Sequence, residues 1–211
     1  DQIQTKATSD KAITVNIDNN RLTVSPSDID DNDIAILNEK IKHIGGKTVA
    51  ILNSKVKQFP TELFRNNNVV NVYLDNNNIV SLPDADQIKE LGLEKLSIRG
   101  NNLKSISAIQ DCQTITHLDI SGNDIYNLSP LLKMNGLQKV VLSGLPLTYP
   151  QVEIFKERKN GLEVVAEDLN ESSSPLPIID NVNITELSDK KVKLTARIRK
   201  NSTGINKVGF Y

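Results

Sequence analysis

The sequence predicts an α/β solenoid, a short right-handed horseshoe in which stacked repeats contribute strands to one parallel, concave sheet. Three observations predict it. Four consecutive segments between Val69 and Leu147 carry apolar residues at the same offsets, and their starts are separated by 24, 22 and 22 residues. Three of these segments also place an asparagine at one fixed offset. Self-similarity at a period of roughly 20–50 residues indicates units that stack because none can bury its apolar face alone.

The four segments align when position 1 is set at Val69, Leu93, Ile115 and Leu137. Apolar residues then also occupy positions 4, 6 and 11 of every segment. They are Val72, Leu96, Leu118 and Val140, then Leu74, Ile98, Ile120 and Leu142, then Ile79, Leu103, Ile125 and Leu147. A weaker copy precedes them, with apolar residues at positions 4, 6 and 11 and a serine at position 9. Its residues are Val49, Ile51, Val56 and Ser54, and it brings the number of predicted repeats to five.

Position 9 belongs to the turn that follows each strand. A strand is predicted over positions 3 to 5, and because successive side chains alternate between faces, positions 4 and 6 point into the core. Asn77, Asn101 and Asn123 hold position 9, and Leu145 interrupts the series. A buried backbone group costs about 1–3 kcal/mol when it is left unpaired, and an asparagine amide can both donate and accept. We therefore expect the asparagines to form a structural ladder between repeats.

The segments between strands are expected to fill the convex side. Apolar residues recur there at positions 14, 17 and 20. They are Leu82, Ile106 and Leu128, then Ala85, Ile109 and Leu131, then Ile88, Cys112 and Met134. Segments of this length favour short helical turns, and Pro130 after Ser129 suits the first turn of one. Because Cys112 aligns with isoleucine and methionine, it is predicted to be a small core residue instead of a reactive thiol.

The N-terminal residues predict a cap. Residues 1–10 are polar and predict a mobile arm, and residues 11–45 predict a β-hairpin followed by an amphipathic helix. Ser27 is the expected N-cap of that helix, with Asp30 three residues on, and Gly45 follows its end. The hairpin and helix would cover the otherwise open apolar end of the stack.

The repeat domain is predicted to span residues 46–170 and to close with a helix over 150–159 and a last strand over 162–166. Residues 171–177, ESSSPLP, have the composition of a linker. Residues 178–211 predict three strands, whereas a β-sandwich needs roughly seven. We expect either the truncated start of a β-sandwich domain or strands that pack on the end of the solenoid.

Composition excludes several classes of partner. The formal net charge is −1, which gives no electrostatic basis for binding nucleic acid or an anionic membrane. No apolar run approaches the roughly 18 residues that a membrane-spanning helix needs. The single cysteine excludes an internal disulfide. We expect no cofactor.

Two groups of residues resemble functional sites, one a catalytic triad and the other a calcium-binding loop. His117, Asp119 and Ser121 follow one another on one strand, about 6.6 Å apart, which is too far for a catalytic triad, so we expect no enzyme. The segment Asp28–Asp33, with Glu39, resembles a calcium loop, but Asp33 stands where that loop requires glycine. Acidic residues near a helix N-terminus are the simpler interpretation, and we expect no metal.

The 22-residue repeats place Asn123, Ile125, Leu128, Pro130 and Leu131 in the order N-x-[IL]-x-x-[IL]-x-P-L and resemble the internalin-like leucine-rich-repeat proteins of bacteria. The resemblance covers about residues 46–166, although the predicted hairpin departs from the helical cap of that group. It implies a secreted or surface-bound binding protein in which a β-sandwich often follows the repeats. The segments KVKLTARIRK and VGFY resemble the start of an Ig-like module of Bacteroidetes surface proteins. The polar arm would then suit the tether of an outer-membrane lipoprotein.

The strand residues that do not point into the core form the concave face, defined as positions 3, 5, 7 and 8. The candidate binding residues on this face are Asn71, Tyr73, Asp75, Lys95, Ser97, Arg99, His117, Asp119 and Lys139. Tyrosine and arginine are enriched at interface hot spots, so Tyr73 and Arg99 are expected to contribute most. The alternative for Asp75 and Arg99, which share position 7 on neighbouring strands, is an ordinary ion pair across the sheet.

The size of the concave face limits its partner. Five strands span about 24 Å, and the face covers about 300 Å², below the approximately 800 Å² per partner of a standard protein interface. We therefore expect a monomer that binds a peptide or a loop of another protein at the cell surface or outside the cell. A glycan-binding or adhesion role and a spacer without a ligand are the alternatives, and scarce aromatic residues count against the glycan.

Overall fold

The computed structural model describes residues 14–18, 21–25, 28–42, 47–169, 178–188 and 191–199. The chain divides into two compact units, residues 1–170 and 171–211. The predicted arm, the predicted linker and the third predicted C-terminal strand lie outside the described residues.

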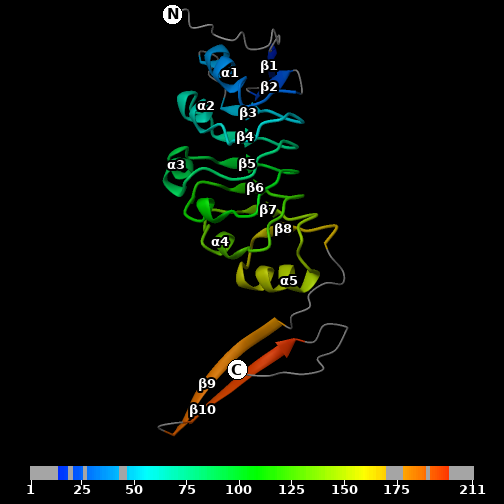
Figure 1. Cartoon of the computed structure of the whole chain (residues 1–211). Helices are drawn as coiled ribbons and strands as arrows, with labels where there is room; N and C mark the ends of the chain where they lie inside the picture. The colour runs from blue at the N-terminus through cyan, green and yellow to red at the C-terminus, as the bar shows by residue number, and fades with distance from the viewer. Residues whose placement is uncertain are drawn as a thin grey trace, which may run out of the picture. The chain divides into compact units, whose positions relative to one another are not determined.

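One eight-stranded sheet organises the first unit, with its strands in the order of the sequence (Figure 1). The strands are β1 (Thr14–Asp18), β2 (Arg21–Ser25), β3 (Thr48–Ala50), β4 (Asn71–Tyr73), β5 (Lys95–Ser97), β6 (His117–Asp119), β7 (Lys139–Val141) and β8 (Glu163–Val165). β1 pairs antiparallel with β2, and β2 to β8 are parallel. From β3 to β7 each strand occupies positions 3 to 5 of its repeat, as predicted, and equal positions lie side by side in register.

Short helices connect the strands, and in Figure 1 α1 to α4 lie on one side of the sheet, whereas α5 lies below β8 at the end of the repeat stack. They are α1 (Ile34–Ile41), α2 (Thr61–Asn66), α3 (Ala85–Glu90), the 3₁₀ helix η1 (Ser107–Ile109), α4 (Ser129–Leu132) and α5 (Tyr149–Arg158). Pro130 lies in the first turn of α4, where its missing N–H costs nothing. In α5, Val152 and Phe155 face the core, as expected for the closing helix.

The core lies between the sheet and the helices, and the apolar residues predicted at positions 4, 6 and 11 are buried in all five repeats. Cys112 is buried with them, as predicted, and burial raises the pKa of its thiol, with Asp111 nearby adding to the effect. The prediction for one convex position was wrong. Ala85 is exposed, because it is the first residue of α3, and Ile88 is the residue that this helix buries.

The asparagines at position 9 form a ladder of hydrogen bonds inside the solenoid. The Asn101 Nδ2 donates to three carbonyl oxygens at 2.9–3.2 Å, one of which belongs to Leu74 of the preceding repeat. The Asn101 Oδ1 accepts from the Ile79 N–H of that same repeat at 2.9 Å. Asn77 and Asn123 repeat this pattern in the adjacent repeats. Each amide therefore joins the turn of its own repeat to that of the repeat before it.

Position 8 is a turn residue, and its assignment to the concave face was wrong. The residues at this position all have a left-handed backbone, with φ between 51° and 65°: Asn53, Asn76, Gly100, Gly122 and Gly144. Only glycine and asparagine adopt this conformation readily. Their backbone N–H groups donate to the position-7 carbonyl of the next strand segment, so the ladder of parallel strands continues through the turn.

The N-terminal helix begins later than expected. Asp33 occupies the N-cap position of α1, and the expected N-cap Ser27 lies outside the described residues. Asp31, one of the acidic residues before α1, has a structural role. Its Oδ1 accepts from the backbone N–H groups of Lys57 and Gln58, both at 3.0 Å. This carboxylate ties the segment before α1 to the first repeat.

The second unit contains β9 (Ile178–Ser188) and β10 (Lys191–Arg199), which pair as an antiparallel hairpin. These strands lie where the sequence predicts the first two strands after the linker. Among the helices of the described residues, none is long and apolar enough to cross a membrane.

Candidate functional site

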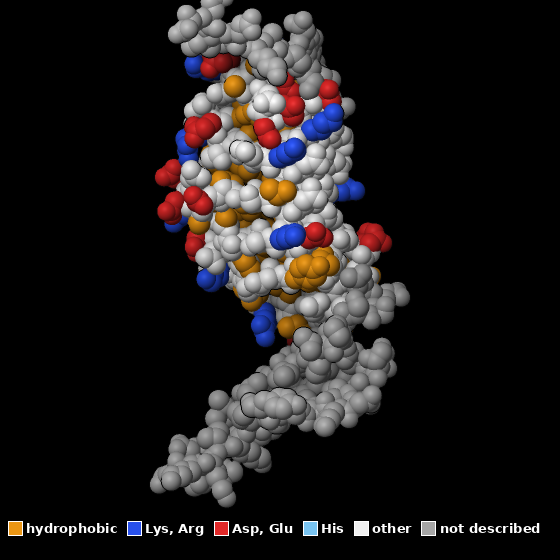
Figure 2. All heavy atoms as spheres, viewed as in Figure 1, with side chains coloured by type: hydrophobic (Ala, Val, Ile, Leu, Met, Phe, Trp, Pro, Cys, Tyr) orange, Lys and Arg blue, Asp and Glu red, His pale blue; other side chains and the backbone are white. Residues whose placement is uncertain are grey.

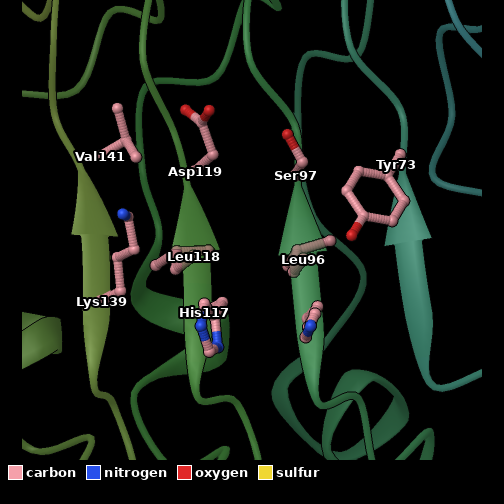
Figure 3. Close-up of a pocket in the computed structure, with 9 residues that line it drawn as sticks. Tyr73, Leu96, Ser97, His117, Leu118, Asp119, Lys139 and Val141 are labelled. Carbon is pink, nitrogen blue, oxygen red and sulfur yellow. The ribbon is translucent and has the colours of Figure 1, made fainter.

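The concave face carries a hollow of about 230 Å³ over strands β4 to β7. Figure 3 shows the side chains that surround it. Two rows of side chains form its sides, one from position 3 and one from position 5, and two leucines of position 4 lie between them. The lining residues are Tyr73, Lys95, Leu96, Ser97, His117, Leu118, Asp119, Lys139 and Val141.

The position-3 row is the more basic of the two. Lys95, His117 and Lys139 stand on consecutive strands in register. The Lys139 Nζ binds the Glu163 carboxylate of the next strand at 2.5 Å. Lys95 is exposed, and its ammonium makes no hydrogen bond or ion pair with the part of the chain that the structure describes. The row therefore contains one lysine with an internal partner and one without.

A hydroxyl orients the ring of His117. The Thr116 hydroxyl lies 3.1 Å from the Glu94 carbonyl oxygen and 2.9 Å from the His117 Nδ1. The donor in the second contact depends on the tautomer of the ring.

A side chain from outside the repeats, that of Arg21, packs against the ring of Tyr73. The guanidinium carbon of Arg21, on β2, lies 4.8 Å from the centre of the Tyr73 ring. Arg21 reaches it across β3, where Ala50 pairs with Tyr73 and leaves room for the longer side chain. The cation covers one ring face, and such a contact contributes about 0.5–1 kcal/mol at an exposed site. In Figure 3 the Tyr73 ring leans toward β5 and borders the hollow.

Asp75 binds its neighbours through hydrogen bonds and not through the predicted ion pair. Its Oδ1 accepts from the Ser97 hydroxyl at 2.5 Å and from the backbone N–H of Arg99 at 3.2 Å. Among the ion pairs of the described residues, none joins Asp75 to the Arg99 guanidinium. Burial raises the pKa of Asp75 above its usual 3.8, and the charge of Asp119 adds to the rise. The two hydrogen bonds oppose it.

Asp119 is bound in a similar way. Its Oδ1 accepts from the backbone N–H and the hydroxyl of Ser121, at 3.0 and 2.6 Å. The Ser121 hydroxyl thus donates to a carboxylate, whereas a catalytic serine donates to a general base such as histidine. Among the described residues, no three His, Cys, Asp or Glu side chains are placed to hold a metal ion.

The structure brings most of the candidate binding residues together. Tyr73, Lys95, Ser97, His117, Asp119 and Lys139 line one hollow. Asn71, Asp75 and Arg99 do not line it. The Asn71 Nδ2 donates to the Thr48 hydroxyl at 3.1 Å, and Asp75 and Arg99 lie farther along their strands at position 7.

Sequence reasoning missed Arg21. Val141 holds position 5 of a recognised repeat and so belongs to the predicted concave face, although it was not among the candidate binding residues. Arg21 carried no signal within the repeats, because its contact with Tyr73 depends on the pairing of β2 with β3.

Comparison with known proteins agrees with this geometry. Residues 67–125 match the family described as leucine rich repeat. The curated Protein toll of Drosophila melanogaster is 36% identical over 89 residues, which cover 40% of this chain and 8% of that protein. An internalin of Listeria monocytogenes has a similar structure, with a TM-score of 0.50 and 18% identity over 61% of this chain and 37% of its own. A leucine-rich-repeat protein of Leptospira interrogans gives a TM-score of 0.49 and 22% identity over 58% of this chain and 33% of its own.

The chain therefore spans well under half of these proteins, and the structural likeness concerns the fold alone. Repeat spacing, strand register and the asparagine ladder all lie in the same part of the chain as the family match. Residues 67–125 are leucine-rich repeats, and the first unit has the leucine-rich-repeat fold.

Proposed function

We propose that this chain is a non-enzymatic module that binds an extended segment of another protein through the hollow on its concave face. The proposal rests on one observation: the hollow is lined by an unpartnered lysine, a histidine and a fixed tyrosine ring, which stand outside the core. Core packing and the asparagine ladder need none of these three side chains. Leucine-rich repeats are typical of protein-binding modules, and the resemblance to internalins implies the same.

The dimensions of the sheet favour an extended ligand over a globular one. Seven parallel strands, β2 to β8, span about 34 Å, and strand residues about 13 Å long give a face of about 440 Å². This is larger than five repeats alone provide, because β2 and β8 extend the sheet. It remains below the approximately 800 Å² of a standard interface. An extended peptide of about ten residues matches the long dimension of the face.

A glycan is less well supported than a peptide. Sugars stack on the open face of an aromatic ring, and the Arg21 guanidinium already covers one face of Tyr73. Among the residues that line the hollow, Tyr73 is the one aromatic side chain. In a spacer without a ligand, Lys95 would be an ordinary solvated lysine, as Lys104 is.

We place the module in a secreted or surface-bound bacterial protein, where it acts as a monomer and where an Ig-like domain follows the repeats. The internalin-like repeats and the β9–β10 hairpin support this placement. Figure 2 shows lysine, arginine, aspartate and glutamate side chains mixed on one side of the repeat stack, without a region of a single charge. Such a surface offers no general attraction for nucleic acid or anionic lipid.

Selection from a phage-displayed library of random twelve-residue peptides tests the proposal. The intact chain should enrich a family of peptides, and a Tyr73→Ala/Lys95→Glu variant should lose them. Lys104→Glu is the matched control, because Lys104 is an exposed lysine at position 12, outside the hollow. Enrichment of the same peptides by the double variant would show that the concave face is not the binding surface.

A further inference from the structure

We infer that Lys95, His117 and Lys139 form a subsite for a carboxylate, so that the bound segment carries an aspartate or glutamate side chain over β6. This inference rests on the proposed function and names the class of peptide that the face takes. Its starting point is the row of basic side chains at position 3.

Register places the three side chains at one strand spacing from each other, about 4.8 Å. Lys95 pairs with His117, and His117 pairs with Lys139. In Figure 3 the Lys139 side chain runs along its strand toward Val141, and its ammonium binds Glu163 on the side away from His117. A carboxylate above His117 would therefore meet the Lys95 ammonium on one side and, on the other, a lysine that already has a partner.

The chain itself binds a carboxylate at this spacing. Glu163 holds position 3 of β8, the strand after Lys139, and its Oε1 lies 2.5 Å from the Lys139 Nζ. On the other side of Lys139, the row continues with His117 and Lys95. None of its remaining residues, as far as β3, is acidic. A ligand carboxylate would take the place opposite Glu163 and give Lys95 the partner that the described residues do not supply.

The acidic side chains of the other positions do not neutralise this row. Asp119, two residues beyond His117, uses its Oδ1 to accept from the N–H and hydroxyl of Ser121. Asp75 accepts from the Ser97 hydroxyl and the Arg99 N–H. Both carboxylates are thus bound to neutral donors at the far end of the strands, away from position 3.

Three acetylated decapeptides test the subsite: (Thr-Glu)5, (Thr-Gln)5 and (Thr-Lys)5, with dissociation constants measured by fluorescence polarisation on the full chain. We expect (Thr-Glu)5 to bind up to about fivefold more tightly than (Thr-Gln)5, the effect of one exposed ion pair, and (Thr-Lys)5 to bind most weakly. Lys95→Gln should remove most of this preference, and Lys104→Gln should retain it.

The failures of the two proposals are distinguishable. Equal binding of the three peptides, lost on Tyr73→Ala, would overturn the carboxylate subsite and leave the peptide-binding face. A preference for (Thr-Glu)5 that persists in Lys95→Gln would also overturn the subsite. If none of the three peptides binds at millimolar concentration, the subsite is wrong, and the phage selection decides separately whether the face binds peptides of another kind.

Discussion

The middle repeats and the terminal repeats complete the same turn with different residues at position 9. In the middle, Asn77, Asn101 and Asn123 each form four hydrogen bonds with the backbone. In the first repeat, the Ser54 hydroxyl donates to the Leu52 carbonyl oxygen at 3.1 Å. In the last repeat, Leu145 buries an apolar side chain, and its backbone N–H bonds the carbonyl oxygen of Leu142 at 3.3 Å.

The preceding repeat explains this difference at one end of the stack. An asparagine at position 9 reaches one carbonyl oxygen and one N–H of the preceding repeat. Before Ser54 lies the N-terminal segment, and the next residue, Lys55, donates its N–H to the Ile29 carbonyl oxygen. Leu145 does follow such a turn, that of Asn123, and the leucine at this position has no structural explanation. The middle of the stack therefore depends on side-chain amides and its ends depend on backbone and apolar contacts.

Replacing a ladder asparagine should give the largest loss of stability. Asn101→Ala removes the four hydrogen bonds that the amide makes with one backbone N–H and three carbonyl oxygens. This loss should lower the free energy of unfolding by about 3–5 kcal/mol. Ser54→Ala removes a single hydrogen bond and should cost less than about 1 kcal/mol. Urea unfolding followed by circular dichroism measures both. Equal losses would show that the middle and terminal turns do not differ in the way described.

The glycines at position 8 allow a second comparison between the middle and the end of the stack. At Gly100, a Cβ would lie 2.3 Å from the Asn76 Oδ1, whereas at Gly144 the nearest atom lies 3.7 Å away. Both residues are left-handed, so an alanine costs about 1 kcal/mol at either position. Gly100→Ala must also displace the Asn76 amide, which donates to Asn53. We expect a loss of about 2 kcal/mol for Gly100→Ala and about 1 kcal/mol for Gly144→Ala.

A double variant checks the cause of that difference. Asn76→Gly removes the side chain that the new methyl group would meet. In the Asn76→Gly background, Gly100→Ala should cost no more than Gly144→Ala does in the intact chain. A persistent difference in urea unfolding would assign the cost of Gly100→Ala to some feature other than the Asn76 contact.

The repeat pattern predicts the core and the strand positions because both depend on local periodicity. Apolar residues at positions 4, 6 and 11 are buried wherever the pattern places them, since alternation along a strand leaves one inward face. The pattern fails at Ala85, which begins the helix α3 and is exposed, whereas Ile88 three residues later is buried as predicted. The left-handed turn at position 8 was visible in the sequence, since only asparagine and glycine occur there, but the regular alternation of the strand was extended one residue too far.

The contacts of the candidate site could be predicted only in part. Periodicity places Tyr73, Lys95, His117 and Lys139 on one face, but it does not say what each side chain bonds. The Arg21 contact with Tyr73 requires the register between the hairpin and the first repeat, which no motif encodes. Asp75 accepts from the Ser97 hydroxyl and from the backbone N–H of Arg99, whereas the alternative interpretation expected an ion pair with the Arg99 guanidinium.

A smaller effect is expected at Asp75, and it should depend on pH. Burial raises the pKa of this carboxyl above 3.8, so the folded chain binds its proton more tightly than the unfolded chain. The stability that protonation contributes is fully present below about pH 3.8 and is lost as pH rises through the higher folded pKa. Asp75→Asn keeps the acceptor oxygen for Ser97 and Arg99 and removes the buried charge. The variant should match or exceed the intact chain in stability at pH 7, and its advantage should shrink toward pH 4.

Urea unfolding at several values of pH measures this difference. Ser97→Ala serves as the companion variant, because it removes one of the hydrogen bonds that lower the Asp75 pKa and should therefore enlarge the pH dependence. A stability difference between the intact chain and Asp75→Asn that grows as pH falls would contradict the assigned direction.

The smallest effect on stability is expected at the contact between Arg21 of the N-terminal hairpin and Tyr73 of β4, a strand of the middle repeats. Arg21→Gln should lower the free energy of unfolding by about 0.5 kcal/mol, because an exposed cation–π contact contributes little. Its effect on binding should be larger than its effect on stability, because the ring at the edge of the hollow loses the group that holds it in place. Arg21→Lys keeps a cation above the ring and should retain most of the affinity for the selected peptides. If Arg21→Gln and Arg21→Lys bind those peptides equally well, the terminal hairpin does not position Tyr73, and the binding face belongs to the repeats alone.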